Sequence, residues 1–486
     1  MNARPDDGVV LPDGCAASAL LLDCLTKASN AFPDTFAAIA MPTAGAAFRK
    51  VYPEVLPAFE AARLASPDRA EIARMLAKTV ARQIRWRDAD GDCALADWLA
   101  GQADAAPLSL ETHAFRGAKG WQATPVYRGE RYGPDSLAEL GSLMAERSVV
   151  TPEAGVALRR LASEAFSAGT LDLAGRRIAV LGAGAEMAPT RHWLEAGADV
   201  LWLDVAPPPA DWFESERFSG TLHWSAAPAD LLRAPQRVLA TLRTFAAAGP
   251  IDLGLYAYAP GQARELRLTA VMNAIVDALG ADALASVTML VSPTTPTARS
   301  AEEDAWVSHR LEARPFWEAG LSGIGLLGRG EGCARATERS GRGATRTVVS
   351  IQGASYQAAQ YLGKVLVAES WASAGVHGAE APVPLRVSAN TAAITRTRSL
   401  DHPVFAAAFG GAGAFGVETF TPRQSRAING LLAVADWMAP ERPVPGGIRV
   451  HGGIHTLPFP LEPALRMAAT FGFARDPRLL RGLLSG

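Results

Sequence analysis

Apolar residues in the first part of the chain recur at the three- and four-residue spacing of an amphipathic helix. The pattern is clearest in residues 15–32 (CAASALLLDCLTKASNAF) and 69–86 (RAEIARMLAKTVARQIRW), and it returns in residues 135–148 and 151–169. This spacing places the apolar side chains on one side of a helix, where they can be buried. We therefore predict that residues 1–170 form a mainly helical region.

Beyond Leu171 the pattern changes to short apolar runs that alternate with amphipathic helical stretches such as 263–280 and 356–375. The apolar runs are as short as buried strands, and strands that alternate with helices form a parallel sheet with helices on both faces. We therefore predict an α/β fold with a doubly wound parallel sheet. The expected strands lie within residues 176–182, 199–204, 251–259, 286–293, 346–353, 384–394 and 446–453.

Two changes of composition divide the chain. The first lies near residue 170 and separates the mainly helical region from a second domain of residues 171–486. Within the second domain, residues 297–345 are richer in arginine, glutamate and glycine than their surroundings, and they come late in the series of strands. We predict that this segment is an insertion or a lid.

Residues 176–204 combine a strand, a glycine turn, a helix and a second strand, in the order of a dinucleotide-binding unit. Gly182 and Gly184 form a G-x-G turn, the helix is expected to begin near Glu186, and Asp204 ends the second strand. Such a turn lets backbone amides approach a diphosphate, and the acidic residue binds the adenine ribose. The sequence therefore predicts a Rossmann-type nucleotide site. The alternative is a plain βαβ unit that uses its glycines for packing, with Asp204 as a strand-end cap.

The residues after the glycines depart from the usual dinucleotide pattern. Ala185, Glu186 and Met187 follow Gly184, and we expect all three to contact the cofactor. Glu186 either faces solvent and caps its own helix or approaches the substrate. Asp204 favours NAD over NADP, because its carboxylate accepts hydrogen bonds from both ribose hydroxyls and repels a 2′-phosphate.

Composition limits the partners. The 486 residues carry a formal net charge of −2, and 49% are hydrophobic. No run of basic residues is present, so a nucleic-acid partner is not expected. The four cysteines are scattered without C-x-x-C pairing, as in reduced cytosolic proteins. The N-terminus lacks the pattern of a signal peptide, and no uncharged stretch is long enough to span a bilayer. We expect a soluble cytoplasmic protein with a small-molecule substrate and a homo-oligomeric state.

The order of strands and turns in residues 176–455 resembles the short-chain dehydrogenase/reductase superfamily. Residues 251–261 are similar to its fourth strand and the turn beside the adenosine, which implies that Ala259 lines the cofactor site. Residues 266–280 resemble the next helix, where Asn273 matches an asparagine of the family. Two features depart from the family: the turn reads G-A-G-A-E-M-A, without the later glycines, and the first 170 residues have no counterpart.

The resemblance also implies a serine, a tyrosine and a lysine that handle a proton while the cofactor transfers a hydride. Ser350 would end a strand, and Lys364 lies on the following helix, where it would lower the pKa of the tyrosine. The family places this tyrosine four residues before the lysine, where the chain has Gln360. Tyr361, about 60° from Lys364 on an α-helix, is our first candidate. Tyr356, about 80° away, is the second, because enoyl reductases of the superfamily use a longer spacing.

An alternative serine is Ser292, which ends a different expected strand. If that strand is the fifth, residues 297–345 separate the serine from the tyrosine. His451 and His455 have the chemistry for proton transfer near pH 7, and His451 stands where the closing strand of the family has an aspartate. We expect no protein-bound metal, because the chain has no H-E-x-x-H motif and no C-x-x-C pair.

These observations lead to one expected function and two alternatives. The expected function is that of an NAD-dependent oxidoreductase, which interconverts an alcohol and a carbonyl or reduces an enoyl double bond. The apolar segment 402–420 (HPVFAAAFGGAGAFGVETF) stands where the family has its substrate loop, which indicates a largely apolar substrate. The alternatives are a non-redox enzyme that keeps NAD bound, such as an epimerase or lyase, and an inactive protein that senses NAD or a metabolite.

Overall fold

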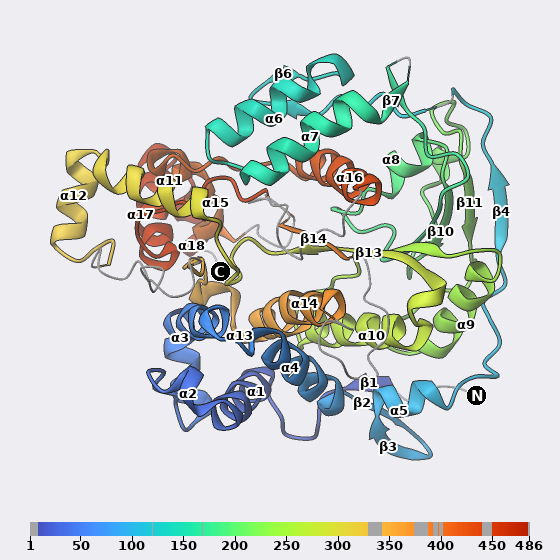
Figure 1. Ribbon diagram of the computed structural model, residues 1–486, viewed down its shortest axis with the longest axis horizontal. Coiled ribbons are helices and arrows are strands. Elements are labelled where there is room, and N and C mark those ends of the chain that lie inside the picture. Colours follow the sequence, from blue (N-terminus) through green and yellow to red (C-terminus); the bar gives the residue numbers. More distant parts are fainter. Residues whose placement is uncertain are drawn as a thin grey trace.

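The computed structural model describes residues 8–118, 120–167, 169–328, 343–373, 387–391, 397, 402–439 and 450–484. Its centre is a seven-stranded sheet (Figure 1). Six neighbouring strands are parallel, and β4 pairs antiparallel with β11 at one edge. This confirms the predicted α/β class with a mostly parallel sheet. In spatial order the strands are β14 (Val387–Thr391), β13 (Leu284–Val291), β12 (Ile251–Leu255), β9 (Arg177–Leu181), β10 (Asp199–Leu203), β11 (Thr221–Trp224) and β4 (Glu111–Ala114).

Side chains of the central strands alternate between two hydrophobic cores. In β9, Ala179 and Leu181 are buried in one core, and Ile178 and Val180 are buried in the other. A strand that is buried on both faces needs apolar residues at successive positions, which explains the continuous apolar runs in the sequence. The two cores require helices on both faces of the sheet, and Figure 1 shows them there.

Each face has its own set of helices. One face is covered by α9 (Pro235–Ala246), α10 (Arg264–Leu279) and a composite helix, which consists of α13 (Ala354–Gln357), a π-helix (Ala358–Leu366) and α14 (Val367–Ala372). The opposite face is covered by α6 (Leu137–Glu146), α7 (Pro152–Glu164), α8 (Thr190–Glu195) and α16 (Pro422–Met438). Within the described ranges, no helix is long and apolar enough to cross a membrane.

The residues before 170 are mainly helical, and they contribute to both faces. α6 and α7 belong to one core, whereas the core on the other face includes α1 (Ala17–Ala31), α3 (Gly45–Ala65), α4 (Arg69–Gln83) and α5 (Leu95–Ala100). The same part of the chain supplies β4 to the sheet. The boundary near residue 170 stays a prediction, since residues on either side of it share both cores.

A further group of helices lies beyond the carboxyl ends of the strands, on the left of Figure 1. It has small hydrophobic cores of its own. Residues 297–345, the expected insertion, contribute two helices to this group, and their ends are joined because the Thr345 amide donates to the Thr297 carbonyl at 2.9 Å. The group contains α11 (Ala301–Glu312), α12 (Phe316–Gly323), α15 (Pro403–Gly411), a 3-10 turn (Ala412–Phe415), α17 (Leu461–Arg475) and α18 (Leu479–Leu484).

Two of the expected strands differ from the structure. Residues 346–353 form no strand: Val348 and Val349 are buried in separate cores, which explains their apolar character, and a 3-10 turn begins at Ser350. Of the expected closing strand, residues 446–449 lie outside the described residues. Val450 forms an isolated bridge with Val150, away from the main sheet.

Candidate functional site

A cavity of about 780 Å³ lies at the carboxyl ends of the parallel strands. The chain passes from β9 to β10 on one side of the sheet and returns to β12 on the other side of β9. Such a reversal opens a crevice at the carboxyl edge of a parallel sheet. The composite helix lines the cavity through Tyr356, Gln360 and Lys364, and the sheet side is formed by residues 185–187, Leu255, Tyr256, Tyr258, Pro260 and 290–294.

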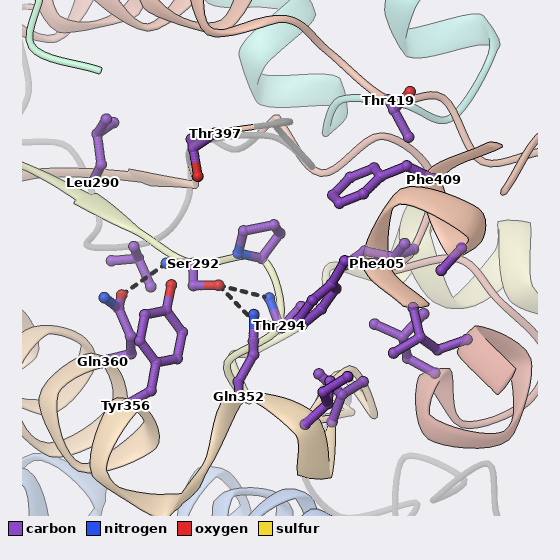
Figure 2. A pocket seen from close by; sticks show the side chains of 18 of the residues that line it. Leu290, Ser292, Thr294, Gln352, Tyr356, Gln360, Thr397, Phe405, Phe409 and Thr419 are labelled. Atoms are coloured by element: carbon purple, nitrogen blue, oxygen red, sulfur yellow. Dashed lines mark hydrogen bonds between the residues drawn. The ribbon is translucent and has the colours of Figure 1, made fainter. Parts of the chain in front are cut away.

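Ser292 follows β13 directly and is held by Gln360 and Thr294 (Figure 2). Its backbone N–H donates to Oε1 of Gln360 at 2.8 Å, and its hydroxyl is 2.7 Å from that of Thr294. The Thr294 hydroxyl in turn donates to Oε1 of Gln352 at 2.6 Å. These bonds fix the position of the Ser292 hydroxyl at the edge of the cavity.

Tyr356 lies on the helix side of the cavity, with its hydroxyl directed toward Ser292 (Figure 2). Burial raises the pKa of this hydroxyl above its usual value, and the side-chain hydrogen bond with Ser292 only partly offsets the rise. The charge of Glu265 raises the pKa further. Tyr356 therefore keeps its proton at neutral pH and can donate a hydrogen bond into the cavity. The expected lowering of the tyrosine pKa by Lys364 is not found, because burial raises this pKa instead.

Lys364 places a titratable ammonium group in the same cavity. Its Nζ donates to the backbone carbonyl of Leu290, the second-last residue of β13, at 2.7 Å. Burial lowers the pKa of Lys364 from 10.5 to about 8. The ammonium group therefore titrates close to the physiological range, which is unusual for lysine and common at functional sites.

The π-helix helps to explain which tyrosine shares a cavity with Lys364. The angles of 60° and 80° assumed an α-helix, but residues 358–366 make the wider i→i+5 turns of a π-helix, which change the direction of every later side chain. Tyr356 and Lys364 consequently line one cavity. Tyr361 lies on the buried side of the helix, and its hydroxyl donates to Oε2 of Glu60 at 2.7 Å. The structure does not bring Tyr361 and Lys364 together.

Ser350 also lies away from the cavity lining. Its hydroxyl donates to Oε1 of Glu462 at 2.6 Å, and its backbone N–H donates to Oε2 of the same carboxylate at 2.7 Å. Ser350 starts a 3-10 turn and ends no strand, because the fifth strand from β9 along the chain is β13. The serine beside the tyrosine is Ser292, and residues 297–345 separate the two in sequence.

The glycine turn adopts a tight conformation at the end of β9. Gly182 has a φ of 78°, and a Cβ at this position would collide with the backbone of Ala257. The Gly184 N–H donates to Oδ2 of Asp204 at 2.9 Å. Asp204 thus ties the turn to the end of β10, in the manner of the strand-end cap, and Gly182, Gly184 and Asp204 are not among the residues that line the cavity.

The residues after the turn differ from the expected helix start. α8 begins at Thr190 instead of near Glu186, and residues 185–189 form turns. Ala185, Glu186 and Met187 line the rim of the cavity. Glu186 is exposed, but it does not cap its helix, because α8 has no side-chain cap and its N-cap residue is Pro189. The backbone carbonyl of Glu186 accepts a hydrogen bond from Arg426 of α16 at 3.2 Å.

Two residues implied by the resemblance lie close to the cavity without lining it. Ala259 packs against the core next to α10, between Tyr258 and Pro260, which do line the cavity. Asn273 of α10 donates through Nδ2 to the carbonyl of Gly363 at 2.8 Å. Asn273 therefore holds α10 against the π-helix.

His451 and His455 meet Glu303 of α11 in a buried cluster. Oε1 of Glu303 lies 3.6 Å from Nε2 of His451 and 3.7 Å from Nδ1 of His455, and the candidate ligand atoms all lie within 4.8 Å of one another. One feature argues against metal coordination by His451. The Gly453 N–H donates to Nδ1 of His451 at 3.1 Å, which leaves the proton of a neutral ring on Nε2, the atom nearest Glu303. The rings of His451 and His455 stack at an interplanar angle of 13°.

The cluster instead supports the turn that carries Ser292. Nε2 of His455 lies 3.0 Å from the carbonyl of Pro293, so it donates to this oxygen. Glu303 also accepts the Ser300 N–H through Oε2 in the capping box of α11. The H-x-x-x-H spacing of His451 and His455 is present in the sequence but was overlooked when a metal site was judged absent. The third member, Glu303, was not, because it lies far away along the chain.

Sequence analysis missed most of the residues that shape the cavity. Gln360, which stands at the family's tyrosine position, orients Ser292, and Gln352 orients Thr294. The apolar half of the cavity is formed by α15 and α17. α15 lies within the apolar segment 402–420, which was expected to be the substrate loop. α17 was not predicted to contribute, because apolar residues at helical spacing are equally typical of an ordinary core.

Comparison with known proteins adds no assignment to this geometry. No protein-family model matches the chain, and no curated protein has significant similarity to its sequence.

Proposed function

We propose that this protein is an NAD-dependent oxidoreductase built on a doubly wound, Rossmann-type sheet. It would interconvert an alcohol and a carbonyl, or reduce an enoyl double bond, on a largely apolar substrate. The observation that carries the proposal is the convergence of Ser292, Tyr356 and Lys364 on one cavity at the carboxyl ends of the strands. The strand order supports the Rossmann type. In dinucleotide-binding sheets, too, the chain adds strands first on one side of the first strand and then on its other side, as it does here around β9.

The glycine turn and Asp204 would hold the cofactor. The tight approach of Gly182 to Ala257 keeps side chains away from the end of β9, and residues 185–187 face the cavity. The Asp204 carboxylate would exchange its hydrogen bond from the Gly184 amide for hydrogen bonds from the ribose hydroxyls. The negative charge of Asp204 would repel a 2′-phosphate and so select the unphosphorylated ribose of NAD. When bound, the nicotinamide supplies or accepts the hydride.

The residues of the chain supply the proton and the charge. Tyr356 is protonated at neutral pH and would pass its proton to the substrate oxygen as negative charge develops on that oxygen, while Ser292 donates or accepts a hydrogen bond at the same atom. Lys364 carries a positive charge below about pH 8, which stabilises negative charge that develops in the cavity. Tyr356 takes the role first considered for Tyr361.

The first prediction concerns the two tyrosines. Tyr356→Phe should lower kcat for NADH oxidation by roughly 100-fold or more with aldehydes, ketones or enoyl thioesters, because the proton donor is lost. The affinity for NADH should not change. Tyr361→Phe serves as the matched control: it removes the bond to Glu60 and lowers the unfolding temperature, but it keeps the activity. Full activity in Tyr356→Phe would contradict the proposed mechanism.

One observation favours a second candidate, a protein that binds a small molecule without redox chemistry. The Gly184 amide is already bonded to Asp204, and α8 begins at Thr190, so the turn offers fewer amides to a diphosphate than the usual motif. Calorimetry with NADH separates the two candidates. Heat that saturates, and that disappears in Gly184→Val, supports the oxidoreductase, whereas no heat with wild-type protein supports the binding protein.

A further inference from the structure

We propose that the apolar half of the cavity is a channel for one unbranched hydrocarbon chain, which makes the substrate a small amphiphile with its polar, reacting end at Ser292 and Tyr356. The assignment of the reacting end rests on the proposed function. The channel itself rests on the residues that line it, and its binding can be measured without any reaction.

Two helices face each other across this half of the cavity. α15 and the 3-10 turn after it present Phe405, Ala408, Phe409 and Ala412, and α17 presents Leu461, Ala464, Leu465 and Ala468. Each set follows the spacing i, i+3, i+4, i+7 of one helix face. Large and small side chains alternate in both sets. Leu465 also packs against the small core of Ala407, Ala408 and Ala469, so the two helices approach closely there and leave only a narrow space for a ligand.

Polar groups are concentrated at the other end of the cavity. Among the lining residues the charged ones are Glu186 and Lys364, and both belong to the sheet end. Figure 2 shows a similar division: Ser292, Gln360, Tyr356 and Gln352 lie on one side, and Phe405 and Phe409 lie on the other, where Thr419 is the labelled polar residue. A ligand with one polar end and one apolar end matches this arrangement, whereas a ligand that is polar throughout would leave its hydrogen-bonding groups unpaired among apolar side chains.

The far end of the channel is closed by direct contact between the helices. Gly411 of α15 lies against the carbonyl of Ala468, and Gly472 of α17 lies against the carbonyl of Ala407, so that a Cβ at either glycine would collide with backbone. The helices already touch at this crossing, which fixes the width of the channel and gives it a floor near Ala468.

The length of the channel sets an expected chain length. The lining face of α17, from Leu461 to Ala468, covers seven residue steps, or about 10 Å at about 1.5 Å per residue. An extended alkyl chain advances about 1.3 Å per carbon, because carbon–carbon bonds are about 1.5 Å long and follow a zigzag. The channel therefore fits about eight carbons.

The test is calorimetric titration of the full chain with straight primary alcohols from butanol to dodecanol, without cofactor. Affinity should rise about fourfold for each added methylene until about eight carbons and then stop rising. Ala468→Phe, at the floor, should move this limit to shorter chains, and so should Ala408→Phe on the facing helix. Ala474→Phe, on the exposed end of α17, is the matched control and should behave as the wild type.

A measurement on the wild type alone keeps the test decisive if a variant fails to fold. Cyclohexylethanol has eight carbons but a bulky ring, and it should bind at least tenfold more weakly than octanol if the channel is narrow. Equal affinity for both alcohols, no dependence on chain length, or no binding of any alcohol would overturn the channel. Alcohol binding without NADH turnover would refute the oxidoreductase and leave the channel in place.

Discussion

The ammonium group of Lys364 lies in a cavity whose other lining side chains are mostly apolar. Its folded-state pKa of about 8 lies below the ordinary value of 10.5, so the unfolded chain binds more protons than the folded chain between these two values. The free energy of unfolding must therefore rise with pH across this window, and the cost of the buried charge is fully present below pH 8.

This leads to a prediction that requires no substrate. Lys364→Met removes the buried charge, so the variant should melt at a higher temperature than the wild type at pH 7, and the difference should shrink steadily toward pH 10.5. Thermal unfolding followed by circular dichroism over this pH range measures it. Lys78→Met, on the exposed side of α4, is the control and should show no such trend. A constant difference for Lys364→Met would mean that the lysine is well solvated.

At the scale of single residues, the sequence indicated which residue types could act at a site better than it indicated where their side chains lie in the fold. Lys364, Tyr356 and Asp204 could be named because their residue types stand at recognisable distances from a strand or a glycine turn. The choice between Tyr356 and Tyr361 could not be made, because it depends on the buried partner Glu60, about 300 residues earlier. Long-range partners of this kind leave no local pattern in the sequence.

At the scale of helices and strands, the composite helix shows why the angles between its side chains could not be predicted from the sequence. Its hydrophobic pattern fits an α-helix, yet residues 358–366 form a π-helix. Close packing on α10 accompanies this conformation: a Cβ on Gly363 would lie 2.7 Å from Cγ2 of Thr269, and Asn273 binds the Gly363 carbonyl. The presence of a helix was readable from local spacing, whereas its winding depends on a neighbouring element.

The contact between Gly363 and α10 gives a prediction at this scale. Gly363→Ala should push the π-helix away from α10 and lower the free energy of unfolding by about 1–3 kcal/mol, as other overpacked sites do. Thr269→Ser removes the methyl group that would collide and keeps the hydroxyl that donates to the Glu265 carbonyl. The double variant should therefore recover much of the loss, as measured by urea unfolding. An additive loss in the double variant would show that a different contact is responsible.

The N-terminal part of the chain determines how the whole molecule is held together. Leu20, Leu21 and Leu25 of α1 are fully buried in the core that also contains the composite helix. The hydroxyl of Tyr52 in α3 donates to the carbonyl of Ser350 at 2.9 Å, and Arg63 binds Glu369 of α14 at 2.9 Å. The sequence predicted that this region is helical, but periodicity contains no information about which distant surface a helix covers.

A truncation tests whether residue 170 separates two independent domains. Residues 171–486, expressed alone, should aggregate or lack a cooperative thermal transition, because removal of α1, α3 and α4 exposes the apolar face of the composite helix, and removal of β4 opens the edge of β11. Solubility and melting of the fragment are compared with those of the full chain. A soluble fragment that melts cooperatively would establish residue 170 as a true domain boundary.

The distance along the chain between Arg63 and Glu369 has a consequence for biosynthesis. These partners are 306 residues apart, and ribosomes add about 5–20 residues per second, so α3 leaves the ribosome roughly 15–60 s before its partner helix exists. During that interval α3 can pack only against its early neighbours such as α1 and α4, while the core that they share with the composite helix stays incomplete. The nascent protein should therefore depend on chaperones that shield early helices, and its yield should be sensitive to the speed of translation.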